Sequence, residues 1–122
     1  MKVLLSIKPE FALKIFDGTK KYEFRKSIFK RNNINTVVVY ASYPIQKIIG
    51  EFEIEDILCK DLDSLWQVTK KESGITKDFY DEYFANKEMA FAIQIGDIIR
   101  YQNPKYLSEF DIDFAPQSFM YL

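Results

Sequence analysis

Residues 6–26, which read SIKPEFALKIFDGTKKYEFRK, decide how the chain begins to fold. Pro9 suits the first position of a helix because its missing N–H is not needed there. Gly18 suits the left-handed residue that closes a helix. Between them, apolar residues recur at the spacing of one helix face: Phe11, Ala12, Ile15 and Phe16.

Residues 21–26 follow this helix and alternate as a strand does. In a strand, successive side chains point to opposite faces. The alternation therefore places Tyr22 and Phe24 on one face and brings Glu23 and Arg25 together on the other.

Lys20 lies in the turn just before this strand, so we expect it near Glu23 and Arg25 at the edge of the sheet. Arginine supplies a planar fork of donors and lysine a compact charge, which suits an anionic or amide-bearing ligand. An ion network that only orders a strand edge explains the same spacing. Both interpretations remain open from the residues alone.

Outward from this segment, the pattern of apolar residues predicts further strands at 2–7, 36–42, 47–59, 88–100 and 119–122, with Gly50 at a bulge or bend. It predicts helices over 61–71 and 76–84, capped by Asp61 and Thr76, and a helical turn at 106–110. Strands occur in pairs rather than alternating with helices, which disfavours a doubly wound parallel sheet. We expect a single α+β domain over 1–122, with a mostly antiparallel, open-barrel sheet and flanking helices.

Composition narrows the possible functions. The 122 residues include no His and one Cys, which removes His-dependent nucleophile systems, cysteine-rich zinc sites and disulfides. We expect no metal and no cofactor. The longest apolar run is too short to span a membrane, and no signal peptide is evident. These features predict a soluble, cytoplasmic protein without a membrane partner.

Charge is distributed unevenly along the chain. The formal net charge is −1, but residues 1–35 carry nine basic and three acidic side chains, a balance of +6. Such asymmetry indicates an anionic partner at the basic end, although solvated surface lysines produce it too.

The string Gly18-x-Lys20-x-x-Glu23-x-Arg25, after a helix opened by Ser6-Ile7-Lys8-Pro9, resembles the signature of the ASCH domain family in the PUA-like superfamily. The ending Pro116-Gln117-Ser118-Phe119 resembles the tail of small stand-alone members. The resemblance implies a PUA-like β-barrel with a cleft that binds RNA or a nucleotide-like ligand.

The family has two functional variants. One comprises binding modules for RNA or modified nucleotides, some with ribonuclease activity. The other is an amidohydrolase that acts on N4-acylated cytidine through a Lys, a Thr and a Glu. The resemblance places these on Lys20, Glu23 and Glu72. Because Glu23 occupies the Thr position, the hydroxyl that hydrolysis would use is missing.

We therefore predict a binding domain for RNA or a modified nucleoside or nucleotide. The alternatives are an amidohydrolase with Lys20, Glu72 and Glu23 as catalytic residues, a ribonuclease, and a module that binds a protein partner. The predicted ligand-binding residues are Lys8, Lys20, Tyr22, Glu23, Arg25, Lys26, Gln117 and Ser118.

Overall fold

The computed structural model describes all 122 residues of the chain. Its elements follow the predicted order. They are β1 (Lys2–Ile7), α1 (Pro9–Asp17), β2 (Tyr22–Arg25), β3 (Thr36–Ala41), β4 (Lys47–Asp61), α2 (Leu62–Thr69), the 3-10 helix η1 (Lys70–Glu72), α3 (Lys77–Tyr83), β5 (Met89–Lys105), the 3-10 helix η2 (Leu107–Phe110) and β6 (Phe119–Tyr121).

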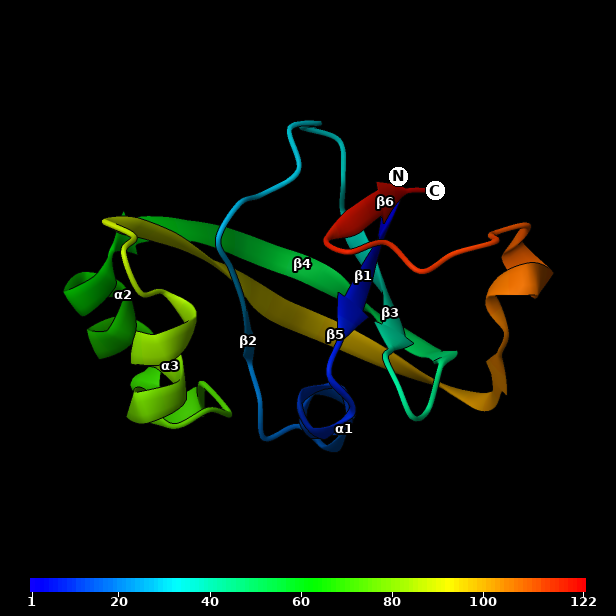
Figure 1. Cartoon of the computed structure of the whole chain (residues 1–122), viewed down its shortest axis with the longest axis horizontal. Helices are drawn as coiled ribbons and strands as arrows, with labels where there is room; N and C mark the ends of the chain where they lie inside the picture. Colours follow the sequence, from blue (N-terminus) through cyan, green and yellow to red (C-terminus); the bar gives the residue numbers. More distant parts are fainter.

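The six strands form one sheet in the order β2-β5-β4-β3-β1-β6. β1 pairs with β3 in parallel, and the other four neighbouring pairs are antiparallel. The sheet curls into a half-barrel (Figure 1), so β2 and β1, which are not neighbours in it, approach each other. The predicted α+β class, with a mostly antiparallel open-barrel sheet and flanking helices, is confirmed.

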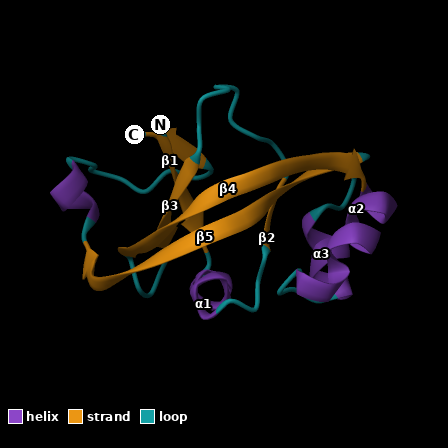
Figure 2. Cartoon of the chain, turned by 180° about the vertical axis from the view of Figure 1, so that it is seen from behind, coloured by secondary structure: helices purple, strands orange, loops and turns teal.

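Helix α1 lies below the curled sheet in Figures 1 and 2 and packs against it. It begins at Pro9 and ends at Gly18, which has the predicted left-handed conformation with φ of 88°. Its buried face packs against β-branched residues of β1 and β3, which suit the half-buried surface of a sheet. The main core contains Ala12, Ile15, Phe16, Val3, Val37, Val39 and Phe52 among its buried residues.

Helices α2 and α3 pack at one end of the long β4–β5 pair, and η2 lies at the other end (Figure 2). The predicted caps are confirmed: the side chains of Asp61 and Thr76 accept hydrogen bonds from the N–H groups of Ser64 and Phe79. A second, aromatic core fixes these helices on the sheet; it includes Phe24, Leu65, Tyr80, Phe84, Ala90 and Ala92, with Trp66 packed against it.

Strands β4 and β5 are longer than the sequence predicts. They pair from Asp61 opposite Met89 to Ile48 opposite Lys105. This pairing supplies backbone partners that extend each strand beyond its alternating segment. The irregularity predicted at Gly50 is confirmed, because the register shifts there.

No helix in the structure has the length and apolar character needed to cross a membrane.

Candidate functional site

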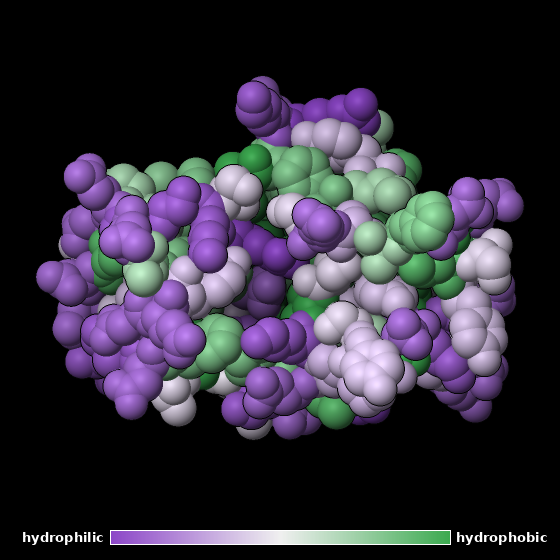
Figure 3. Space-filling view, viewed as in Figure 1, coloured by the Kyte–Doolittle hydropathy of each residue, from purple (hydrophilic) through white to green (hydrophobic).

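A cleft of about 290 Å³ lies where β2, the end of β1, the start of α1 and helix α3 meet. Figure 3, which has the same view as Figure 1, shows a hollow near the centre of the molecule with hydrophilic residues within it. Half of its lining is polar and comes from Ser6, Lys8, Lys20, Glu23, Arg25 and Gln117. The apolar half comes from Ile7, Phe11, Phe24, Ile75, Phe79 and Tyr83.

Lys20 is the most buried polar residue of the cleft, with 1% of its surface exposed. Its backbone N–H donates to the carbonyl of Lys14, which fixes the turn after α1. The Nζ of Lys20 donates to the carbonyl oxygen of Ser73 at 2.7 Å. It also lies 5.2 Å and 5.1 Å from the ring centres of Phe11 and Phe24, where the π-electrons attract a cation.

The loop of residues 72–74 forms the support of this lysine. Its three carbonyl oxygens accept hydrogen bonds from the Lys21 N–H, the Lys20 Nζ and the Lys14 Nζ, at 2.8, 2.7 and 3.2 Å. Gly74 has φ of +69°, and a Cβ there would lie 2.6 Å from the stem of Lys20. The loop therefore holds the ammonium group in place, and glycine permits the close approach.

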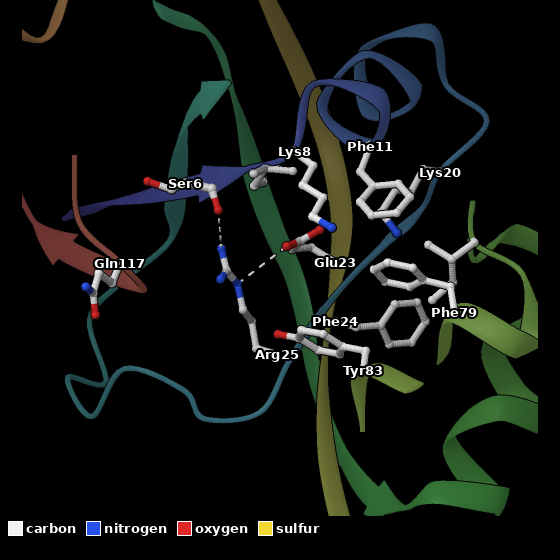
Figure 4. A pocket seen from close by; sticks show the side chains of 12 residues that line it. Ser6, Lys8, Phe11, Lys20, Glu23, Phe24, Arg25, Phe79, Tyr83 and Gln117 are labelled. Atoms are coloured by element: carbon white, nitrogen blue, oxygen red, sulfur yellow. Dashed lines mark hydrogen bonds and ion pairs between the residues drawn. The ribbon is translucent and has the colours of Figure 1, made fainter. Parts of the chain in front are cut away.

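Glu23 and Arg25 meet on one face of β2, as predicted. The Nε of Arg25 lies 3.4 Å from a carboxylate oxygen of Glu23, and their side chains are 12% and 10% exposed, respectively. The Nη2 of Arg25 donates to the Ser6 carbonyl at 3.1 Å, across the open side of the half-barrel (Figure 4). The pair thus joins β2 to β1 and remains at the cleft.

Aromatic rings from α1 and α3 form the opposite wall. Phe11 and Phe79 pack edge to face at 5.0 Å, and Phe79 and Tyr83 are nearly parallel at 6.1 Å. The Nζ atoms of Lys8 and Lys26 lie over Phe79 and Tyr83, at 5.3 Å and 4.8 Å from the ring centres. This wall offers flat apolar surface bordered by positive charge.

Five of the predicted site residues line the cleft together: Lys8, Lys20, Glu23, Arg25 and Gln117. Four others do not line it. Lys26 is exposed above Tyr83, Tyr22 packs against the aromatic core, Ser118 is half-buried in the tail, and Glu72 is exposed.

The sequence prediction missed the aromatic wall and the loop that supports Lys20. Phe11, Phe79 and Tyr83 occur at helical spacing, which indicates ordinary packing. The pair Ser73-Gly74 indicates only the end of a helix. The one available signal was the glycine, since a close backbone approach is one reason for glycine in a loop.

Burial lowers the pKa of Lys20 from its ordinary value of 10.5 to about 8; Glu23 opposes the change and Lys14 adds to it. Burial raises the pKa of Tyr80 to about 12.

Between pH 8 and 10.5 the unfolded chain binds more protons at Lys20 than the folded protein does, so the free energy of unfolding rises with pH. Above pH 10 the unfolded Tyr80 ionises first, so stability then falls.

We therefore expect maximal stability near pH 10, with a gain of about 2 kcal/mol over pH 7 from Lys20. Urea denaturation across this range measures it. The variant Lys20→Met keeps a buried apolar stem without the charge, so the increase in the free energy of unfolding between pH 7 and pH 10 should be absent. An equal rise in the variant would contradict the assignment to Lys20.

Residues 5–99 match the family model of the ASCH domain. Over 117 residues the chain is 32% identical to an ASCH domain-containing ribonuclease of Zymomonas mobilis, covering 94% of this chain and 79% of that protein. The crystal structure of ASCH from Zymomonas mobilis superposes with a TM-score of 0.91 and 29% identity, covering 99% of this chain and 87% of that chain.

The large ribosomal subunit protein uL22 of Ureaplasma parvum is 32% identical over 120 residues, which is 98% of this chain. This chain spans only 39% of the length of that relative. The family model covers more than half of the chain, and the Zymomonas mobilis relative is covered over most of its length, so we conclude that the chain belongs to the ASCH domain family.

Proposed function

We propose that this protein binds single-stranded RNA and that one nucleotide enters the cleft. The observation that carries the proposal is the nearly buried ammonium group of Lys20 in a cleft walled by aromatic rings. The name of the Zymomonas mobilis relative, a ribonuclease, supports RNA as the ligand class. The positive balance of residues 1–35 supports an anionic partner.

The size of the cleft favours one nucleotide over a duplex. Its volume of about 290 Å³ is near the lower limit for pockets that enclose small ligands. Bases of single strands are free to leave their neighbours and stack on aromatic side chains, whereas bases in a helix are not. Phe79 and Tyr83 supply such rings at the cleft.

Lys20 is suited to hold an anionic or carbonyl oxygen. An ammonium group has three donors, and the Ser73 carbonyl takes one of them. The remaining donors act in a site from which the surrounding rings exclude most water, which strengthens each electrostatic contact. Lys8, exposed at the rim, extends the positive surface toward a phosphate.

Cleavage of the bound RNA is a second candidate function. The lowered pKa of Lys20 favours it, because a fraction of the amine is neutral near pH 8. A neutral amine accepts the proton of a ribose 2′-hydroxyl while that oxygen attacks the adjacent phosphorus; the 5′-oxygen leaves and takes a proton from solvent. We propose that either activity takes place in the cytoplasm.

The other two alternatives receive less support. The amidohydrolase requires Glu72 beside Lys20, but the Glu72 side chain is exposed and does not line the cleft. A protein partner fits the basic surface but does not account for a concave site with a buried ammonium group.

The test measures binding of a short, labelled single-stranded RNA of mixed sequence by fluorescence anisotropy, while gel analysis of the same samples detects cleavage. We expect Lys20→Met to weaken binding roughly 10- to 100-fold, because a hydrogen bond to a charged group contributes about 1.5–3 kcal/mol. The slope of log affinity against log salt concentration should also decrease in magnitude by about one, because one contact to the RNA is lost.

Lys87→Met is the matched control, because it removes the same charge at an exposed position outside the cleft. It should retain nearly all affinity. Equal losses in the two variants would show that the effect is one of net charge and would contradict a specific role for Lys20.

A further inference from the structure

Glu23 and Arg25 retain hydrogen-bonding capacity that the protein does not fill. The carboxylate of Glu23 makes one polar contact, the ion pair with Arg25 at 3.4 Å. The Nε of Arg25 is the atom that faces this carboxylate, but the contact does not have hydrogen-bond geometry, so the buried N–H has no hydrogen-bond partner. Buried polar groups are normally paired, so this exception indicates a group that is completed by a ligand.

A phosphate is a poor match for this part of the cleft. Any anion that reaches Arg25 also meets the carboxylate of Glu23, whose side chain is 10% exposed, and like charges repel strongly where water is scarce. The pair instead presents an acceptor and a donor side by side. That arrangement complements a neutral group that both donates and accepts.

We propose that Glu23 and Arg25 select the base of the bound nucleotide, and that this base is cytosine or guanine. This inference rests on the proposed RNA-binding function. Both bases carry an amino group and a carbonyl oxygen on the Watson–Crick edge, which is the edge that proteins read in unpaired bases. Glu23 accepts from the amino group, and Arg25 donates to the carbonyl oxygen on the same edge.

Uracil and adenine each lack one of the two groups. Uracil has carbonyl oxygens but no amino group. When it is placed as cytosine is, a carbonyl oxygen takes the position of the amino group and faces the carboxylate of Glu23. Adenine has the amino group but no carbonyl oxygen for the arginine. A site with buried polar groups discriminates strongly against a ligand that leaves them unpaired.

The first experiment compares uridine oligomers that differ only in one central base, with binding to the wild-type protein measured by anisotropy. We expect cytosine and guanine to bind roughly tenfold or more tightly than uracil and adenine, as a well-placed pair of base contacts does. Inosine, which is guanine without its amino group, should lose this advantage. The inosine result needs no protein variant.

The second experiment uses Glu23→Gln, which keeps the shape of the side chain and replaces one acceptor with a donor. We expect the base preference to fall below about twofold while uridine oligomers still bind, since a charged acceptor is worth more than a neutral one. Glu55→Gln, exposed on β4, is the matched control and should keep the full preference.

The outcomes separate this inference from the function on which it rests. RNA binding without a base preference, or a preference for uracil or adenine, would overturn the inference and leave RNA binding intact. A preference unchanged in Glu23→Gln or with inosine would overturn the role of the carboxylate. Absence of any RNA binding would overturn the proposed function and this inference with it.

Discussion

Replacement of Tyr80 by alanine is expected to lower the free energy of unfolding by about 3–5 kcal/mol, as loss of a buried aromatic side chain does. Tyr80 is 1% exposed, and its hydroxyl donates to the Leu62 carbonyl at 2.7 Å. Its ring lies between 4.8 and 5.5 Å from those of Trp66, Phe84 and Phe24. The substitution therefore removes the centre of the aromatic core.

The same substitution should abolish RNA binding. Helix α3 carries Phe79 and Tyr83 into the cleft, and the aromatic core holds this helix against the sheet. Without that core the wall of the cleft is no longer fixed. Urea denaturation followed by the fluorescence of Trp66, the only tryptophan, measures the loss of stability at this core.

Tyr80→Phe is the matched control, because it keeps the ring and removes only the hydroxyl. Its expected loss is about 1 kcal/mol, the typical net value of one hydrogen bond. If the alanine variant were no less stable than the phenylalanine variant, the packing role assigned to Tyr80 would be wrong.

Substitution of Gly50 by alanine is expected to destabilise the protein by about 3 kcal/mol, at the upper end for overpacking. A Cβ at this position would lie 2.5 Å from the backbone oxygen of Ile99 and 2.7 Å from the ring of Phe16. A strand carbonyl does not rotate away as a side chain does. Phe16 is itself part of the main core, so α1 or β5 has to move.

Chemical denaturation of Gly50→Ala measures this effect, with Gly96→Ala on β5 as the matched control. At Gly96 the nearest atom to an added Cβ is the Glu53 carbonyl oxygen at 3.2 Å, which a small shift relieves. We expect the free energy of unfolding of Gly96→Ala to fall by less than about 1 kcal/mol. Equal losses would show that glycine flexibility, rather than close packing, explains both positions.

The order of elements was predictable from the sequence because it depends on local patterns. Helix α1 is defined by Pro9, Gly18 and the spacing of the apolar residues between them, and α2 and α3 begin at residues with capping side chains. The ends of β4 and β5 were predicted less accurately, because each long strand is extended by hydrogen bonds to the other.

The candidate site was predictable in part. The strand alternation was sufficient to place Glu23 and Arg25 together, because neighbours two apart on a strand share a face. Charge and spacing identified Lys20, but neither indicated that its side chain is buried.

The sequence by itself thus determined the elements, their order and the motif on β2. Only the tertiary structure decided what surrounds the motif: the Ser73 carbonyl that holds Lys20 lies 53 residues further along the chain, and the ring of Phe79 comes from α3. The reason is physical. Local spacing governs hydrogen bonds within helices and neighbouring residues of a strand, whereas the cleft exists only because the sheet curls and brings β1, β2 and the helices onto one face.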